Sequence, residues 1–502
     1  MLAAVCAAPV CASVPPEPLV GRVVAIEGGI QIRSAGGQWS AAEVDLPLAG
    51  GMAVRADADG RAELRFGADT VALAAGSEVE LGQLDAAAGL HLLLHQGRIG
   101  VALSPADPTH TIDVDTPRGQ VWLQTAGNYD IAAGDAKGPV RLEVFSGQAR
   151  FVGSGSGTTI AAGEASALGA DDPVLTKLDA AATDAFSQWW QAADAAADAS
   201  AALAHVSPEM TGYAALAGAG RWQNVTGYGA VWFPTAAPSD WVPYRFGHWR
   251  WIEPWGWTWI DDRAWGFAPS HYGRWARFPA DGGTRRWGWV PGEPRVADPE
   301  FMPAAVAFLG TSGVGISYPD ASGPAVGWFP LAPGEVYWPR YTSDLATIRR
   351  LNRGAVADVA AIGPTTDGTP PASVIDGTYR NREFATVVPR AVFVAGKPVA
   401  PAIVQLPAER LKNAPLLAGS PDIAPAVPRA AMLTAEARHA PTTAAKKAEA
   451  VRVLARILPP HRRAIAVGWR ARRPSRERLR IVRASFHRGE RRHLRFAAFR
   501  RR

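Results

Sequence analysis

The chain has 502 residues, 48% of them hydrophobic, a length that allows two to four domains at about 100–200 residues each. Its 41 prolines and 51 glycines exceed what compact helical domains tolerate, which excludes a mainly helical protein and favours strands, turns and linkers. The net charge of +6 is uneven, because residues 461–502 contain sixteen arginines and two glutamates, a balance of +14, which leaves −8 for the rest. The basic end, rather than the acidic body, is therefore expected to meet an anionic surface.

Residues 1–13 are predicted to be a secretory signal, because they are apolar and end in small side chains around a cleavage point after Ala12. The charged start of such a signal is absent, so the true start codon is left open. Cleavage would remove Cys6 and Cys11, the two cysteines of the chain, and with them disulfide, thiolate-metal and cysteine-nucleophile chemistry. No later segment has the roughly 18 uninterrupted apolar residues of a membrane span. We therefore expect an exported protein of the periplasm or cell envelope; the alternative is a frayed cytosolic N-terminus.

From about residue 18 to 170, short runs of alternating apolar and polar residues are separated by glycines. Apolar residues at every second position place one face of a strand in a core, and regularly spaced runs indicate an all-β sandwich or barrel. The runs are Gly21–Ile26, Ala62–Phe66, Val71–Leu73, Leu90–Leu94, Thr111–Asp115 and Arg141–Phe145.

Five motifs of this segment follow one another in an order that resembles the periplasmic FecR domain, named for the sensor of iron-citrate uptake systems. They are Pro47–Gly51, Arg61–Phe66, Leu92–Gly97, Val114–Gly119 and Val144–Gly147. The resemblance covers residues 18–170 and implies a β-sandwich or jelly-roll-like domain. FecR regulators carry a cytoplasmic domain that binds a sigma factor and then a membrane span, whereas this chain begins with the predicted export signal. Periplasmic signal sensing without an anti-sigma domain is therefore kept as an alternative function.

Residues 171–212 are predicted to be a helical connector. Asp171–Pro173 forms a helix start, and an alanine-rich stretch continues to His205. The residues spaced for its buried face are Leu178, Phe186, Trp189 and Trp190.

Fourteen of the nineteen tryptophans lie between Trp222 and Trp338, and residues 213–293 are internally repetitive. Copies of short motifs at spacings of tens of residues predict tandem β-hairpins. The motif Phe246–Trp249 recurs as Tyr272–Trp275, the Trp-Gly-Trp of residues 255–257 recurs at 287–289, and Tyr228–Trp232 is a partial earlier copy.

The turns of these hairpins are expected at Glu253-Pro254, Asp261-Asp262 and Gly282-Gly283, since proline, aspartate and glycine favour turns. The block resembles the tryptophan-rich module that follows a FecR domain in many uncharacterised bacterial envelope proteins. That resemblance implies no known activity.

Two interpretations of the tryptophans stay open. In the first, the rings fill the core of a small module, with Arg245, Arg250, Arg274 and Arg277 stacked over them as cation–π partners. In the second, a binding face meets an envelope glycan or a protein partner, since sugar rings stack on exposed indoles. The residues of that predicted face are Trp249, Trp251, Trp255, Trp257, Trp259, Tyr272, Trp275, Trp287 and Trp289.

Residues 294–400 contain strand-like pieces and are predicted to extend the tryptophan-rich module. Residues 401–502 are rich in alanine, proline and arginine, and are predicted to form a largely disordered basic tail. The tail could contact anionic lipid or lipopolysaccharide phosphates, or be a solvated extension without a partner; nucleic acid is disfavoured in an exported protein. The arginines expected at such a surface are Arg472, Arg473, Arg476, Arg478, Arg480, Arg491 and Arg492.

The sequence contains no recognisable catalytic motif. His91 and His95 lie four apart in a leucine-rich strand and are expected to have no carboxylate neighbour, so we expect no metal site, and no cofactor is implied. Glu253, Asp261 and Asp262 are the carboxylates that a cell-wall glycan hydrolase would need, although each is placed in a turn. We therefore predict a mainly β, non-enzymatic binding or scaffolding protein, with hydrolysis and FecR-like sensing as alternatives.

Overall fold

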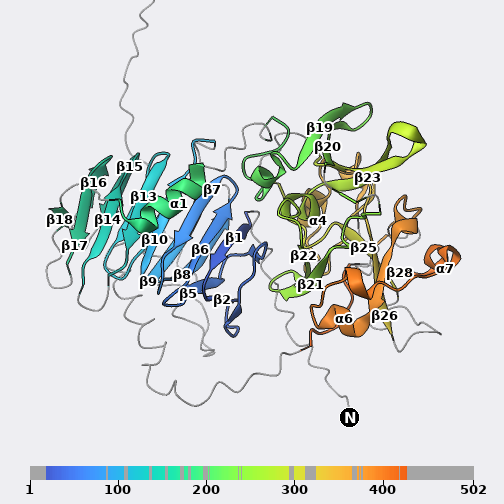
Figure 1. Cartoon of the computed structure of the whole chain (residues 1–502), viewed down its shortest axis with the longest axis horizontal. Coiled ribbons are helices and arrows are strands. Elements are labelled where there is room, and N and C mark those ends of the chain that lie inside the picture. The colour runs from blue at the N-terminus through green and yellow to red at the C-terminus, as the bar shows by residue number, and fades with distance from the viewer. Residues whose placement is uncertain are drawn as a thin grey trace, which may run out of the picture.

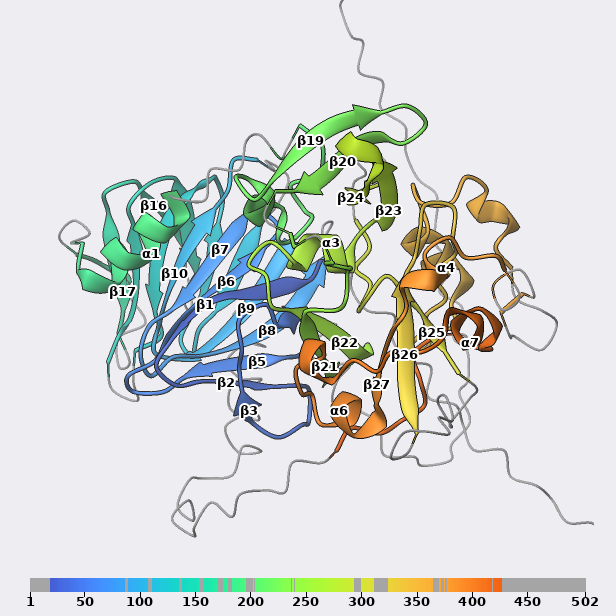
Figure 2. The same ribbon diagram turned by 45° about the vertical axis from the view of Figure 1, so that its right-hand side comes forward.

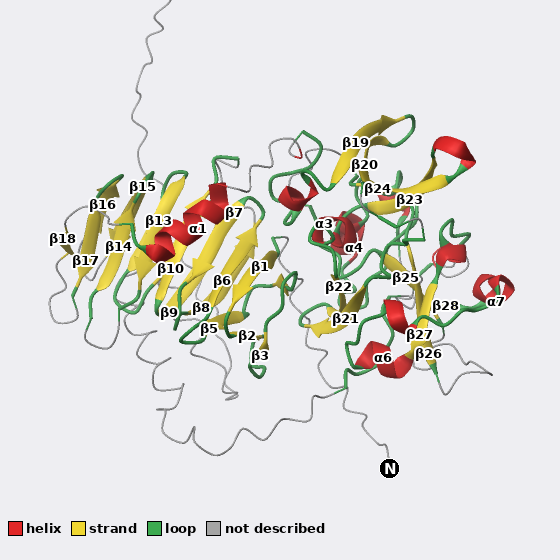
Figure 3. Ribbon diagram, in the orientation of Figure 1, coloured by secondary structure: helices red, strands yellow, loops and turns green. Residues whose placement is uncertain are grey.

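The computed structural model in Figure 1 describes residues 19–426 apart from short gaps, of which the longest are 196–201, 293–298, 311–323 and 364–369. The predicted export signal and the tail arginines lie outside the described residues. Strands predominate, so the predicted mainly β fold is confirmed (Figure 3). None of the helices in the described part of the chain is both long and apolar enough to cross a membrane.

The N-terminal part, residues 19–178, is a two-layer β-sandwich, whose layers are visible in Figure 2. Sheet 1 has the order β18 (Leu175–Leu178), β17 (Ala165–Leu168), β14 (Val140–Val144), β13 (Gly127–Ala132), β10 (Arg98–Leu103), β7 (Asp69–Leu73), β6 (Arg61–Phe66), β1 (Gly21–Glu27) and β4 (Pro47–Leu48). Sheet 2 has the order β16 (Gly157–Ala161), β15 (Gln148–Val152), β12 (Gln120–Leu123), β11 (Ile112–Asp115), β9 (Gly89–Gln96), β8 (Glu78–Asp85), β5 (Ala53–Ala56), β2 (Ile30–Arg33) and β3 (Ser40–Ala41).

Alternation along the strands builds the core of the sandwich. In β9, Leu90, Leu92 and Leu94 are buried, whereas His91 and His95 occupy the alternate positions and point out of the sandwich. Buried aliphatic residues from both sheets belong to one core cluster. The two sheets therefore pack face to face through the apolar positions that the sequence pattern marks.

The segment after the sandwich differs from the predicted connector. Helix α1 covers only Ala185–Ala195, and the predicted helix start at Asp171 was wrong, because Leu175–Leu178 forms the edge strand β18 and pairs with β17. The helix begins instead at a capping box: Ser187 N donates to Asp184 Oδ1 at 2.9 Å, and Asp184 N donates to Ser187 Oγ at 2.8 Å. Figure 1 shows α1 lying across sheet 1.

Residues 213–426 form a second part, here called the aromatic module, beside the sandwich (Figures 1 and 2). Its strands make a four-stranded sheet β19-β20-β24-β23, a hairpin β21-β22 and a four-stranded sheet β27-β26-β25-β28. The strands are β19 (Gly220–Val225), β20 (Gly229–Pro234), β21 (Gly247–Ile252), β22 (Gly256–Asp261), β23 (Arg274–Pro279), β24 (Arg285–Val290), β25 (Val306–Leu309), β26 (Ala325–Pro330), β27 (Thr386–Pro389) and β28 (Leu416–Leu417).

The helices of the aromatic module are short. The α-helices are α3 (Phe267–His271), α4 (Leu345–Leu351), α6 (Arg390–Val394) and α7 (Ala408–Asn413). The 3-10 turns are η1 (Tyr213–Leu216), η2 (Asp281–Gly283), η3 (Val359–Ala361), η4 (Arg382–Phe384) and η5 (Ala400–Ala402).

The predicted tandem hairpins are present as β19-β20, β21-β22 and β23-β24, and each carries a tryptophan pair directly across its two strands. The pairs are Trp222 with Trp232, Trp249 with Trp259, Trp251 with Trp257, and Trp275 with Trp289. Facing side chains on neighbouring strands are the closest contacts that a sheet offers. The repeated motif therefore repeats a cross-strand indole pair.

The folded part extends beyond the predicted start of the basic tail at residue 401. Leu411 and Ile423 are buried, and Leu416 of β28 pairs with Leu309 of β25. The described residues up to 426 therefore belong to the aromatic module.

Candidate functional site

The structure divides the nine residues of the predicted binding face into two unequal groups. Eight are at most 7% exposed: Trp249, Trp255, Trp257, Trp259, Tyr272, Trp275, Trp287 and Trp289. The ninth, Trp251, is 39% exposed. The nine residues therefore do not form one solvent-facing aromatic surface, because eight of them are buried in the protein interior.

Trp249 lies at the centre of the ring contacts. Its ring centroid is 5.2–5.5 Å from those of four other aromatic residues, and the contacts are tilted or edge-to-face, the arrangements that aromatic quadrupoles favour. The four rings belong to Trp259, Phe308, Trp328 and Phe393. Since these residues come from three different strands and from α6, the cluster joins the hairpins to the extension.

Several buried indoles also donate their N–H group to carbonyls outside regular ladders. Trp257 Nε1 donates to the carbonyl of Ile423 at 2.8 Å, and Trp328 Nε1 donates to that of Tyr244 at 2.8 Å. Trp275 and Trp289 donate to the carbonyls of Pro269 and Tyr272, at 2.9 Å and 2.8 Å. These bonds fix irregular backbone that a strand ladder does not satisfy.

Three of the four arginines take other roles than the predicted cation–π stack. Of the four expected, Arg277 has a ring contact, with its guanidinium carbon 4.7 Å from the Phe384 centroid and 5.8 Å from that of Trp287. Arg274 is buried and donates to Asn352 Oδ1 at 2.9 Å. The remaining two make polar contacts, Arg245 with Thr386 and Arg250 with Glu43. Arg263, which the sequence did not single out, lies over the rings of Trp241, Phe246 and Trp265.

Trp251 stands at the end of β21 with its indole held in place. Its Nε1 donates to Glu253 Oε1 at 2.7 Å, and its ring meets that of Trp257 edge-on at a centroid distance of 5.7 Å. Gly256, with φ of 82°, lies beside the ring, where a Cβ would be 3.4 Å from it. Trp251 is thus an ordered aromatic side chain that remains accessible to solvent.

Among the described residues, Trp251 and the 45% exposed Val44 are the large hydrophobic side chains that are most open to solvent. Val44 follows Glu43 and Trp251 follows Arg250 in the chain, and these two charged residues form an ion pair between the sandwich and the aromatic module, with Glu43 Oε1 at 2.5 Å from Arg250 Nη1. Arg250 and Trp251 are consecutive in β21, so their side chains point to opposite faces of the hairpin and Trp251 lies on the face away from this ion pair. We call Trp251 and Glu253, which are joined by a hydrogen bond, the junction patch.

A second, buried contact fixes the same junction. The Arg22 guanidinium on β1 pairs with Asp45 and also donates to the carbonyl of Ala264 at 3.0 Å. Burial raises the pKa of Asp45 to about 6, and the neighbouring Arg22 opposes that rise. In addition, Thr211 Oγ1 donates to the Val20 carbonyl at 2.6 Å. These bonds link the sandwich and the module through groups that water does not reach.

The carboxylates of the predicted hydrolase are not brought together. Glu253 lies in the turn of the β21-β22 hairpin, whereas Asp261 ends β22, so five strand steps of about 3.3 Å, roughly 16 Å, separate the two ends. Asp261 is buried and accepts from Trp259 Nε1 at 3.0 Å; burial raises its pKa to about 7. Asp262 is exposed. Glycosidase carboxyl pairs stand roughly 5 to 9.5 Å apart, a geometry that Glu253 and Asp261 do not provide.

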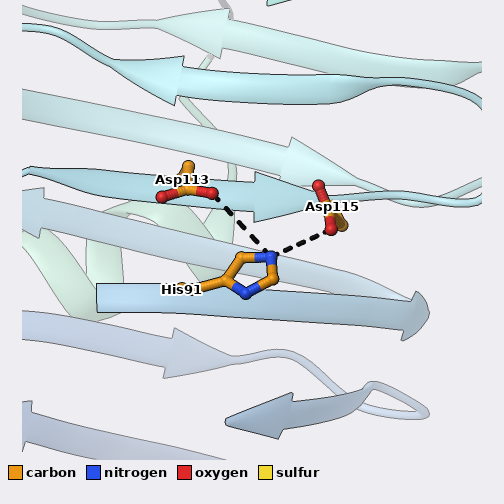
Figure 4. A group of neighbouring side chains, drawn as sticks. All are labelled: His91, Asp113 and Asp115. Carbon is orange, nitrogen blue, oxygen red and sulfur yellow. Dashed lines mark hydrogen bonds and ion pairs between the residues drawn. The ribbon is translucent and has the colours of Figure 1, made fainter. Parts of the chain in front are cut away.

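The expectation for His91 was wrong in one respect, since two carboxylates lie beside it. Strand β11 pairs with β9 in parallel and sets Asp113 opposite His91. Figure 4 shows the three side chains on one face of sheet 2: His91 Nε2 is 2.9 Å from Asp115 Oδ2 and 3.8 Å from Asp113 Oδ2. The neighbours are 22 and 24 residues away in the chain, so strand pairing brings them together and local sequence does not.

His95 on the same strand has a single carboxylate neighbour in the described structure, Glu80, with His95 Nε2 at 3.2 Å from Glu80 Oε2. The two histidines, which lie four residues apart on one strand, therefore have different surroundings. His91 belongs to a group of three potential ligands, and His95 belongs to an exposed pair.

Comparison with known families and structures adds one match in the aromatic module. Residues 213–335 match DUF6600, a family of unknown function. The match spans the three hairpins, β25 and β26, and it agrees with the expectation that the tryptophan-rich block belongs to a module without an assigned activity. No curated protein matches this chain.

Two crystal structures described as a "putative anti-sigma factor" from Parabacteroides distasonis ATCC 8503 are similar to part of the chain. The structure at 2.50 Å resolution is 14% identical with a TM-score of 0.21, and the similarity covers 22% of this chain and 51% of that one. The structure at 1.65 Å is 15% identical with a TM-score of 0.22, covering 24% and 56%. The chain thus spans about half the length of these structures, and at such TM-scores the similarity carries no argument.

Proposed function

We propose that this chain is an exported, non-enzymatic protein of the bacterial cell envelope, in which a rigid scaffold presents the junction patch to a cell-wall glycan. The observation that carries the proposal is the division of the aromatic residues: eight of the nine predicted face residues serve the core, and Trp251 remains exposed. A scaffold needs a rigid frame, and a binding protein needs an ordered accessible group. The aromatic module supplies both.

The rigidity of the frame rests on the contacts between its two parts. These contacts join Arg22 to the Ala264 carbonyl, Arg250 to Glu43, and Thr211 to the Val20 carbonyl, and each pair is at least 191 residues apart in sequence. Buried polar groups that are fully paired favour one relative arrangement, because any other arrangement would leave them without partners. The sandwich therefore acts as a support that fixes the orientation of the β21-β22 hairpin.

The chemistry of the junction patch suits a sugar. An indole offers an apolar face to the CH groups of a pyranose ring, and the Glu253 carboxylate at the edge of that indole can accept hydrogen bonds from hydroxyl groups. A patch of this size predicts weak binding to each glycan unit, and a polymer that repeats its units compensates by offering many sites.

The test is cosedimentation of the full-length protein with purified peptidoglycan sacculi in 0.5 M NaCl, which screens charge contacts of the basic tail. We expect the wild-type protein to pellet and Trp251→Ala to be retained at least fivefold less. The matched control is Trp122→Ala, which removes a half-buried tryptophan on β12, far from the patch in the chain. Equal retention of the two variants, or no pelleting of the wild type, would contradict glycan binding at Trp251.

A protein partner in the envelope is the alternative occupant, and a photo-crosslinking residue at position 251 distinguishes it. Crosslinks to glycan support the proposal, whereas a crosslinked polypeptide shows that the same patch binds protein. Export is tested separately by N-terminal sequencing of the mature chain, which should begin at Ser13. Contact between the tail arginines and anionic lipid or lipopolysaccharide stays a prediction from the sequence.

A further inference from the structure

The group formed by His91, Asp113 and Asp115 is unrelated to the junction patch and lies on the outer face of sheet 2 (Figure 4). The three side chains come from two paired strands, so the ladder fixes their spacing. One nitrogen and two carboxylate oxygens, one from each residue, all lie within 4.8 Å of one another. The His91 side chain is 31% exposed, which leaves the group accessible from solvent.

The distances match the coordination of a small divalent cation. Zinc binds imidazole nitrogen and carboxylate oxygen at about 2.0–2.2 Å, and tetrahedral geometry then separates two ligand atoms by about 3.3 Å. In this structure the Nε2 atom of His91 is 2.9 Å from the Asp115 oxygen and 3.8 Å from the Asp113 oxygen. Shifts of the side-chain atoms by about 0.5 Å would bring both separations between His91 and the aspartates to the coordinated value.

Gln120 on β12 supports the two carboxylates from the opposite side. Its Nε2 donates to Asp115 Oδ1 at 2.8 Å and to Asp113 Oδ2 at 3.3 Å. Asp115 therefore keeps Oδ2 directed at His91 while Oδ1 is held by the amide. Hydrogen bonds of this kind orient ligating carboxylates in metal sites and raise metal affinity.

Gly82 on β8 gives the imidazole its space. A Cβ atom at this position would lie 2.7 Å from His91 Nδ1 and 3.0 Å from the His91 carbonyl. Any larger residue would displace the ring from the position in which Nε2 faces the carboxylates. The position lies in the irregularity of the β8-β9 pairing between Leu81 and Leu84.

We propose that His91, Asp113 and Asp115 bind one divalent transition-metal ion, with Zn²⁺ preferred over Mn²⁺ and with Mg²⁺ and Ca²⁺ bound weakest. The imidazole nitrogen selects against the hard cations, and the Irving–Williams order sets zinc above manganese. Two carboxylates and a neutral imidazole carry a charge of −2, which a divalent ion balances. Water completes the coordination, since the described chain offers three ligand atoms.

The site ties β9 to β11, the one parallel pair among the strand pairs described in the sandwich. Strand β10 between them in the chain belongs to sheet 1, so a bound ion would link two strands that no hairpin connects. An ion that binds only the folded state stabilises it. We therefore expect Zn²⁺ to raise the melting temperature of the protein.

The experiment uses the full-length, untagged protein stripped with EDTA and then dialysed free of it. Isothermal titration with ZnCl₂ is expected to show one saturable site per chain and a higher melting temperature. His91→Gln and Asp115→Asn should each weaken this binding at least tenfold. The matched control is His95→Gln, which removes a histidine from the same face of the same strand and should leave the affinity unchanged.

Each variant is first melted in EDTA, where the three variants should unfold within a few degrees of the wild type, because each new side chain is close in size to the one it replaces. If His91→Gln unfolds early, Asp115→Asn and Gly82→Val still test the site. The proposal is overturned if the wild type has no saturable site up to 100 µM Zn²⁺, or if His91→Gln and His95→Gln bind equally. Tighter binding of Ca²⁺ than of Zn²⁺ would overturn the assignment of the ion.

Discussion

The sandwich and the aromatic module solve the same problem of filling a core in two different ways. The sandwich has long ladders of paired strands, and its core is built mainly from aliphatic residues at alternate positions, such as Leu90 and Leu92. The aromatic module has shorter sheets with more irregular backbone between them, and its core is built from indole and phenyl rings. The contrast is therefore one of backbone regularity as well as of side-chain type.

The difference explains why tryptophan is concentrated in one part. In the sandwich, ladders satisfy the backbone polar groups, so core side chains need only volume. In the module, loops bring carbonyls into the interior, and a buried tryptophan provides both a large apolar surface and one N–H donor. Trp257 and Trp328 use that donor on carbonyls 166 and 84 residues away. A leucine could fill the space but could not make the bond.

Removal of the Trp249 ring, at the centre of the aromatic core, is expected to have the largest effect on stability. Trp249→Ala should destabilise the protein by about 3–5 kcal/mol, because it leaves a cavity among four aromatic rings. The matched control Trp251→Ala, two residues along the same strand, should cost less than about 1 kcal/mol because that ring is partly exposed. Urea unfolding measures both. Equal losses of unfolding free energy in the two variants would mean that burial does not determine how much each tryptophan contributes to stability.

The second prediction concerns Asp261, a buried carboxyl within the aromatic core. Its pKa is raised by burial to about 7 in the folded protein, against an ordinary value of 3.8. Between these values the folded state holds a proton that the unfolded state lacks, so stability is lost as the pH rises. From pH 5 to pH 7 this single group should lower the free energy of unfolding by about 2 kcal/mol.

Asp261→Asn removes that titration and isolates its contribution. The wild type should lose about 2 kcal/mol more than the variant between pH 5 and pH 7, measured by urea unfolding at both values. Asp45, Asp130 and His271 also have shifted pKa values, but they are present in both proteins and cancel in the difference. The same pH dependence in both proteins would show that Asp261 is ionised in the core.

The third prediction has the smallest expected change in stability. It distinguishes the volume that an indole fills from the hydrogen bond that its N–H group donates. Trp257→Phe removes the bond to the Ile423 carbonyl, whereas Trp249→Phe removes an N–H that has no partner in the described part of the chain. Both substitutions delete similar volume, so Trp257→Phe should cost about 1 kcal/mol more, the contribution of one hydrogen bond. Paired urea titrations resolve a difference of this size. A larger loss in Trp249→Phe would contradict the role of the N–H groups.

Much of the fold could be predicted from local patterns. Period-two alternation marked strands such as Leu90–Leu94, and the repeated Trp-Gly-Trp motif marked the hairpins, including the Gly282-Gly283 turn. The helix start at Asp171 was wrong because Leu175–Leu178 pairs with β17. The same four residues can pack in a helix or complete a sheet edge, and the open edge of β17 decides between them.

The sites could be predicted less well. The tryptophans of the predicted binding face gave no sign of which ring is exposed, because Trp249 and Trp251 share one side of a strand and differ only in what covers them. A signal for the buried state did exist, since fourteen tryptophans in one segment need partners for their N–H groups. The surroundings of His91 had no local signal, because both carboxylates come from a strand two steps further along the chain.

By itself, the sequence determined the mainly β character, the positions of most hairpins and the aromatic composition of the second core, because these depend on the period and type of neighbouring residues. Only the tertiary structure decided which indole stays at the surface, which arginine meets a ring, and that His91 stands beside Asp113 and Asp115. The physical reason is the distance along the chain over which each feature is determined. Strand periodicity depends on residues that are only a few positions apart. Burial and ligand geometry depend on residues that only long-range pairing brings within a few ångströms.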